Sequence, residues 1–123
     1  MTIESITFSQ AGLIQAVESC DAAHQLAFYC EEAEVHVIDC DPSRPARVYR
    51  GKRAIQGWLE HTQAEGLLHR VVEFSCVGDR VVLSDYGRYP DGRNLVYRLT
   101  AELSNGQIVR QTVTLAWEDL YDG

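Results

Sequence analysis

The chain has 123 residues, of which 46% are apolar and 24% are charged, a composition typical of a folded domain rather than of a disordered segment. A chain of this length buries roughly two-thirds of the surface that its unfolded form exposes, so it can build a core without disulfides or metal and is too short for two domains. We therefore expect one domain over residues 1–123. The formal net charge of −7 argues against a general nucleic-acid binder, which needs basic charge to neutralise phosphates.

Two helices are predicted at the start of the chain. Ser9 can cap a first helix, whose apolar residues recur at helical spacing and which ends near Cys20. Asp21 can cap a second helix, in which a broad apolar stripe covers residues 22–30 before Glu31 and Glu32 mark a frayed end.

A short strand, a loop and a third helix follow. Residues 35–39 alternate apolar and polar as a strand does, and the two prolines of residues 41–45 keep that segment out of a sheet interior. Residues 47–50 read as a second short strand. Gly51 then lets the chain turn into a helix that presents Ile55 and Trp58 on one face and stops at Gly66.

From Leu67 to Trp117 the apolar period changes from 3.6 to 2. Turn residues at 78–79, 90–92 and 104–106 divide this segment into four long strands joined as antiparallel hairpins. Helices first and a sheet second indicate an α+β fold.

The last strand carries one polar residue on its apolar face. Gln111 shares that face with Val109, Val113, Leu115 and Trp117. A buried amide needs a hydrogen-bond partner that apolar neighbours do not supply. The partner is either a buried water or backbone group, or a polar atom of a ligand.

The absence of certain sequence motifs indicates the cellular location that we expect. The sequence has no apolar run of about eighteen residues, so we expect no membrane span, and residues 1–5 do not read as a secretory signal, so we expect a cytoplasmic protein. The cysteines lack C-x-x-C or zinc spacing, so we expect buried free thiols with no metal or other cofactor, two disulfides being the alternative. They are Cys20, Cys30, Cys40 and Cys76.

The order and spacing of these elements resemble the nuclear transport factor 2-like (NTF2-like) superfamily, in its SnoaL-like and ketosteroid-isomerase-like branch. The resemblance covers nearly the whole chain. It is carried by residues 21–29, residues 31–35, Arg50-Gly51 to Ile55 with Trp58, Asp91-Gly92, and residues 105–109 up to Trp117. It implies a cone in which three N-terminal helices pack against a strongly curved, mostly antiparallel sheet around one pocket, commonly in a homodimer.

The isomerases of this branch use a carboxylate at the end of the first short strand as a proton shuttle, a role that burial and a raised pKa favour. In this chain the resemblance assigns that role to Asp39, or to Asp41 if the loop is shifted. The isomerases also hold the developing enolate with a tyrosine on the first helix and an acid on a long strand. Here the matching regions read Leu13 and the apolar row from Leu95 to Leu103, so that oxyanion hole is missing.

Several further residues are candidates for the pocket. We interpret Tyr29, Trp58 and Tyr97 as ligand-contacting aromatics and Trp117 as a core residue, although aromatic side chains are most often core. On the second long strand Val81, Leu83 and Asp85 alternate, which favours Asp85 over Tyr86 for the pocket. For Asp39, the catalytic role and a structural role as a loop-entry acid that accepts backbone hydrogen bonds are equally favoured.

His61 and His69 are possible acid–base groups, but surface histidines are commoner. The charge is uneven: residues 1–41 carry eight acids and no Lys or Arg, whereas a basic segment follows. That segment could bind an anion at a helix N-terminus, but we expect it mainly to form ion pairs with the acidic first part of the chain. The basic residues are Arg44, Arg47, Arg50, Lys52 and Arg53.

Two functions fit these observations. The first is binding of a small, mostly apolar molecule, with isomerase- or lyase-type chemistry in which Asp39 is the acid–base group and Tyr97 or Gln111 an orienting donor. The second is a non-catalytic dimerisation or interaction module without nucleic-acid or membrane partners. Its contact surface would be the polar sheet face with Arg98, Thr100, Arg110, Thr112 and Thr114.

Overall fold

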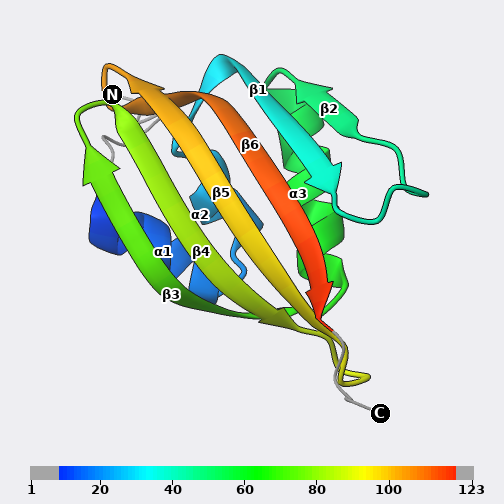
Figure 1. The fold of residues 1–123 in the computed structure, drawn as a ribbon. Coiled ribbons are helices and arrows are strands. Elements are labelled where there is room, and N and C mark those ends of the chain that lie inside the picture. Colours follow the sequence, from blue (N-terminus) through cyan, green and yellow to red (C-terminus); the bar gives the residue numbers. More distant parts are fainter. Residues whose placement is uncertain (1–8, 119–123) are drawn as a thin grey trace.

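Three helices cover one face of a six-stranded sheet in the computed structural model, which describes residues 9–118 (Figure 1). The helices are α1 (Gln10–Glu18), α2 (Ala22–Leu26) and α3 (Lys52–Ala64). The strands are β1 (Tyr29–Asp39), β2 (Arg47–Arg50), β3 (Leu68–Val77), β4 (Arg80–Arg88), β5 (Asn94–Ser104) and β6 (Gln107–Glu118). The predicted α+β architecture, with helices first and four long strands afterwards, is confirmed.

The strand order in the sheet is β2-β1-β6-β5-β4-β3. Only the pair β1 and β6 is parallel, and all other neighbouring strands are antiparallel. The register places Asp85, Tyr97 and Leu115 side by side across β4, β5 and β6. Since side chains alternate between the two faces of a strand, these three point to the same side.

The helix caps form where the sequence predicts them. The Ser9 hydroxyl accepts a hydrogen bond from the amide of Gly12 at 3.2 Å, and the Asp21 carboxylate accepts one from the amide of His24 at 3.0 Å. Both side chains satisfy amides that a helix leaves free at its first turn. Gly66, with φ of +72°, follows the C-cap of α3 in the left-handed conformation that favours glycine.

The predicted extent of the second helix is wrong. Helix α2 has only five residues, and the chain from Tyr29 onward is the first part of an eleven-residue strand β1. This segment is a strand because it pairs with β6: Tyr29 lies opposite Ile108, and the amide of Ile108 donates to the carbonyl of Phe28 at 2.8 Å. A run of apolar residues fits a helix or a buried strand equally well, so only the partner strand decides.

The core lies between the helices and the sheet face that they cover. Among its largest fully buried side chains are Phe28, Ile55, Leu67, Leu83, Leu95 and Ile108. The alternation predicted for β6 is wrong at its start, because Ile108 is buried and Val109 is only half-buried. A register shift after Glu102 brings Leu103 opposite Ile108 and exchanges the two faces there.

All four cysteines are free, but the expectation that they are buried is wrong, since Cys20 and Cys30 are half-buried and the other two are exposed. Cys40 and Cys76 are exposed, because Cys40 follows the end of β1 and Cys76 lies near the end of the edge strand β3. No helix among residues 9–118 is both long enough and apolar enough to cross a membrane.

The expected contact between the acidic first part of the chain and the basic segment forms. The Arg50 guanidinium lies 3.3 Å from the Glu34 carboxylate, on the paired strands β1 and β2. Arg44 lies 3.6 Å from Asp39 and 3.8 Å from Asp41. The hairpin of β1 and β2 therefore pairs its own opposite charges.

Candidate functional site

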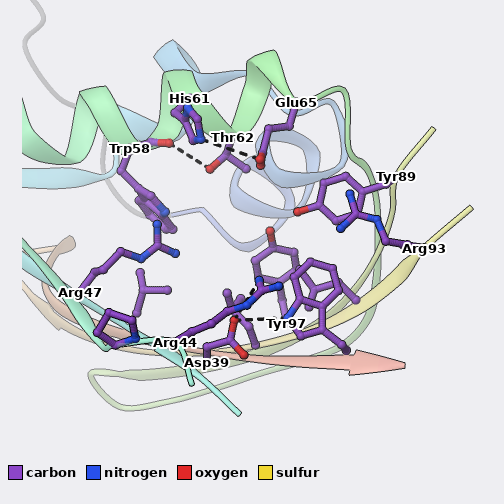
Figure 2. A pocket seen from close by; sticks show the side chains of 15 residues that line it. Asp39, Arg44, Arg47, Trp58, His61, Thr62, Glu65, Tyr89, Arg93 and Tyr97 are labelled. Carbon is purple, nitrogen blue, oxygen red and sulfur yellow. Dashed lines mark hydrogen bonds and ion pairs between the residues drawn. The ribbon is translucent and has the colours of Figure 1, made fainter. Parts of the chain in front are cut away.

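A cavity of about 390 Å³ opens between α3 and the sheet, at the end where the β1–β2 loop and the β4–β5 turn lie (Figure 2). Its apolar walls are Val37, Leu95 and Leu115, and its aromatic walls are Trp58, Tyr89, Tyr97 and Trp117. The strands supply one wall and α3 supplies the other, which is why the cavity exists only when the sheet curves around the helix.

A second, smaller void of about 50 Å³ lies deeper in the domain. It shares Trp58, Thr62 and Tyr97 with the larger cavity, so these three side chains border both spaces. The deep void also contacts His69, Asp85 and Gln111 among apolar neighbours. Its volume is enough for about one to three water molecules.

His69 and Asp85 form a buried pair at this void. The Nδ1 atom of His69 lies 2.5 Å from Oδ2 of Asp85, and the two side chains are only 7% and 3% exposed. Burial raises the pKa of the Asp85 carboxyl, while the hydrogen bond and charge of His69 oppose that shift. The hydrogen bond joins two groups that are able to exchange protons, the Asp85 carboxyl and the His69 imidazole.

Tyr97 lies against this pair. Its ring centroid is 5.4 Å from that of His69, with a 46° angle between the ring planes. Burial raises the pKa of the Tyr97 hydroxyl, and the charge of Asp85 raises it further. The hydroxyl therefore stays protonated at neutral pH and is able to donate a hydrogen bond.

Gln111 receives its hydrogen bond from an unexpected group. The partner is neither water nor backbone: the Tyr29 hydroxyl donates to Oε1 of Gln111 at 2.7 Å, and both residues are buried. Burial raises the pKa of Tyr29, so this hydroxyl also keeps its proton. Tyr29 lines neither cavity and contacts the deep void only through Gln111.

Two buried polar atoms have no hydrogen-bond partner within residues 9–118. They are Oδ1 of Asp85, an acceptor, and Nε2 of Gln111, a donor. Both side chains line the deep void. Because a buried unpaired polar group costs about 1–3 kcal/mol, a molecule in the void that pairs with either atom would gain stabilisation.

Asp39 lies on the wall of the larger cavity, as predicted, and its side chain is 8% exposed. Its carboxylate accepts hydrogen bonds from the amide of Asp41 at 2.8 Å and from Nε1 of Trp117 at 3.3 Å, and it lies 3.6 Å from Arg44. It thus performs the loop-entry role. Asp41 binds the amide and hydroxyl of Ser43 and lines neither cavity.

Aromatic rings and guanidinium groups form the rim of the larger cavity. Tyr89 and Trp117 stack at 5.7 Å, Arg93 lies over both rings, and Arg44 lies 5.0 Å from the centre of the Trp117 ring. Arg47 also lines the cavity (Figure 2). Trp117, which we interpreted as a core residue, is half-buried: it packs against the core and also lines the cavity.

The structure brings four of the predicted residues to the two cavities from separate strands and from α3: Trp58, Tyr97, Asp85 and Gln111. Asp85 points inward, whereas Tyr86 is 45% exposed, as the strand pattern predicts. Sequence reasoning underrated His69. The signal was available in the alternation of Leu67, His69 and Val71, which places the imidazole on the core side of β3.

His61 remains at the exposed rim, 3.8 Å from Glu65. Over the described range 9–118, no three His, Cys, Asp or Glu side chains gather closely enough to hold a metal ion.

No protein-family model matches the sequence, and no curated protein matches it. Solved structures do match. An NTF2-like protein of unknown function from Burkholderia xenovorans aligns with a TM-score of 0.73 and 18% identity, over 92% of this chain and 84% of that one. A putative ketosteroid isomerase from Kribbella flavida aligns with a TM-score of 0.65 and 16% identity, over 92% and 77%.

An uncharacterised protein with a cystatin-like fold from Silicibacter pomeroyi aligns with a TM-score of 0.68 and 16% identity, over 85% of this chain and 71% of that one. These likenesses show that the chain has the NTF2-like, cystatin-like α+β fold. At such identities they carry the architecture and not the activity.

Proposed function

We propose that this chain binds a small, mostly apolar molecule in its cone and transfers a proton on it through His69 and Asp85. The observation that carries the proposal is a buried imidazole–carboxyl pair beside a void with unpaired polar atoms. Perturbed acid–base groups in a concave, largely apolar site are typical of catalytic centres.

The cavity suits such a ligand. Its volume of about 390 Å³ lies within the usual range of small-molecule sites. Apolar and aromatic side chains of the strands and Trp58 supply part of the wall, and burying apolar ligand surface against them provides about 25 cal/mol for each Å² removed from water. Polar and charged side chains make up the rest of the wall, among them Asp39, Arg44, Arg47, His61, Thr62, Glu65 and Arg93, and they can fix the orientation of a ligand.

The chemistry follows from the pair. With Asp85 ionised, Nδ1–H of His69 donates to Oδ2, and Nε2 of the imidazole is left as the proton acceptor. When Nε2 takes a proton from a carbon next to a carbonyl, the carbonyl oxygen gains the electron pair as an enolate, and Asp85 stabilises the imidazolium. Return of the proton to another carbon completes an isomerisation, and loss of a leaving group from the adjacent carbon completes a lyase reaction.

Tyr97 is the donor placed to stabilise the enolate. Its hydroxyl stays protonated, and its ring contacts that of His69. Preorganised donors of this kind lower the energy of a developing oxyanion. The oxyanion hole that is missing from the first helix and the apolar row of β5 is thus replaced by one tyrosine on β5.

Asp39 stays a prediction as a catalytic group. To act as a base it would give up the hydrogen bonds from Asp41 and Trp117, which hold its carboxylate at the cavity wall. We therefore assign proton transfer to His69. Asp39 instead holds Arg44 and Trp117 in place at the rim.

The test is exchange of the protons next to a carbonyl with solvent deuterium, followed by nuclear magnetic resonance for a panel of apolar ketones. The wild type should accelerate exchange for at least one ketone, and His69→Gln should remove the acceleration by about two orders of magnitude, as expected for loss of a general base. His36→Gln is the matched control, since His36 pairs with Glu34 away from both cavities.

Ketones that bind without any exchange above the buffer rate would refute the catalytic part and leave a ligand-binding protein. Acceleration that survives His69→Gln but is lost in Asp39→Asn would return the catalytic role to Asp39.

A homodimer through the outer sheet face is a second, compatible proposal. Arg98 and Arg110 are exposed on that face, and Tyr86 adds an exposed aromatic ring. The face could pair with a second copy without blocking the cavity, which opens between α3 and the other side of the sheet.

A further inference from the structure

Gln111 is a polar residue of the deep void that the acid–base chemistry does not use, and Tyr29 is its hydrogen-bond partner. Gln111 is 1% exposed and Tyr29 is 3% exposed. They come from β1 and β6, and the register places Gln111 between Val35 on β1 and Ala101 on β5. Burial of an amide in this apolar part of the sheet lowers stability unless its polar atoms are hydrogen-bonded.

The hydrogen bond from Tyr29 fixes which end of the amide faces the void. A tyrosine hydroxyl has one hydrogen to donate, and Oε1 of Gln111 accepts it at 2.7 Å. If the amide were turned over, Nε2 would donate to the tyrosine oxygen and the hydroxyl hydrogen would lose its acceptor. The buried network therefore favours the orientation in which Oε1 is occupied and Nε2 is unpaired.

The surroundings of Nε2 show what is missing. Gln111 lines the deep void together with apolar side chains, including Val17, Leu83, Leu99 and Val113. None of these four accepts a hydrogen bond. Polar side chains also line the void, among them Thr62, His69, Asp85 and Tyr97, yet Nε2 has no partner among the residues that the structure describes. The void lies next to the larger cavity, because Trp58, Thr62 and Tyr97 border both spaces.

We propose that Gln111 determines specificity by donating one hydrogen bond to a neutral acceptor, such as a carbonyl or ether oxygen, at the deep end of the ligand. Tyr29 is the positioning residue that keeps the amide in its donating orientation. The inference rests on the proposed ligand binding and adds the class of ligand: an apolar molecule with an acceptor at its leading end, in preference to one with a donor or no polar group there.

The experiment compares 4-phenylbutan-2-one with butylbenzene, two probes that differ by a carbonyl in place of a methylene group. Dissociation constants are measured by ligand-observed nuclear magnetic resonance for the wild type, Gln111→Leu and Tyr29→Phe. Indole serves as a third probe, because its ring N–H only donates. Gln56→Leu is the matched control, since Gln56 is exposed on α3 and bonds to Glu60.

The ketone-to-hydrocarbon affinity ratio should fall roughly fivefold in Gln111→Leu, the value expected for one neutral hydrogen bond, and should not change in Gln56→Leu. In Tyr29→Phe the amide is free to turn over, so indole should gain affinity relative to the ketone. A purely structural role of Tyr29 would weaken all three probes equally. The double variant Tyr29→Phe/Gln111→Leu, which leaves neither polar group unpaired, repeats the measurement if Gln111→Leu does not fold.

The outcomes separate the two proposals. Binding of both probes with a ratio that Gln111→Leu does not change would overturn the specificity role and leave ligand binding standing. No binding of any probe would overturn both. A ratio that falls as expected while His69→Gln leaves proton exchange unaltered would support the specificity role and refute the catalytic assignment.

Discussion

If Gln111 is kept for a ligand, its removal together with Tyr29 should not weaken the fold. Tyr29→Phe removes one oxygen and almost no volume from a buried position. It breaks a 2.7 Å hydrogen bond and leaves both polar atoms of the Gln111 amide unpaired. We expect a loss of about 2 kcal/mol in the free energy of unfolding, from the 1–3 kcal/mol cost of an unsatisfied buried group, or about 8 °C in Tm.

Gln111→Leu acts in both directions. It removes the unpaired Nε2, which is favourable, and leaves the Tyr29 hydroxyl without an acceptor, which is unfavourable, so the net change should lie within about 1 kcal/mol. In the double variant Tyr29→Phe/Gln111→Leu both groups are apolar. We expect it to be as stable as the wild type or about 1 kcal/mol more stable, with a coupling energy of about 1–4 kcal/mol.

The assay is urea unfolding of the four proteins, followed by circular dichroism, with Tyr86→Phe as the control because Tyr86 is 45% exposed. The reasoning fails if the effects of the two single changes add, or if the double variant is the least stable of the four. Either result would show that the amide contributes to the fold, through a bound water for example, rather than to a ligand.

Three further predictions concern the pair, the packing and the assembly. Burial raises the pKa of Asp85 in the folded state, so the stability that this group contributes is fully present below its unfolded pKa and is lost as the pH rises through its folded pKa. The difference in unfolding free energy between the wild type and Asp85→Asn should therefore change with pH across this window. A constant difference would contradict the shift. A Cβ at Gly87 would lie 3.1–3.2 Å from the Leu67 side chain, so Gly87→Ala should cost about 1–3 kcal/mol, measured by urea unfolding, whereas an unchanged midpoint would show that Leu67 moves freely. Light scattering should give twice the chain mass, and Arg110→Glu should lower it if the outer sheet face forms the dimer; a strictly monomeric mass at micromolar concentrations would count against that face.

Much of the fold could be predicted because its signals are local. Alternation of apolar and polar residues predicts the four long strands. Residues such as Asn105-Gly106, which both have positive φ, predict the turns between them. The caps at Ser9 and Asp21 are likewise local hydrogen bonds. The predicted extent of the second helix was wrong because the chain from Tyr29 onward pairs with β6, which lies about eighty residues away in the sequence.

The candidate site was predictable only in part. Asp85 and Gln111 stand out as polar residues on apolar strand faces, so their burial follows from the pattern. The alternation on β3 also placed His69 inward, but nothing local indicated its partner. That the imidazole meets Asp85, and that Tyr29 meets Gln111 across 82 positions of sequence, depends on strand register.

The sequence alone thus predicted most of the side chains that the strands bury, because burial follows the period of each element and neighbouring residues show that period. Only the tertiary structure decided which of those side chains meet. The order of strands in the sheet and the curvature around α3 bring β1, β4, β5 and β6 to one pair of cavities. Hydrogen bonds act over about 3 Å, so a partner for a buried polar atom is set by this long-range packing and not by composition or spacing.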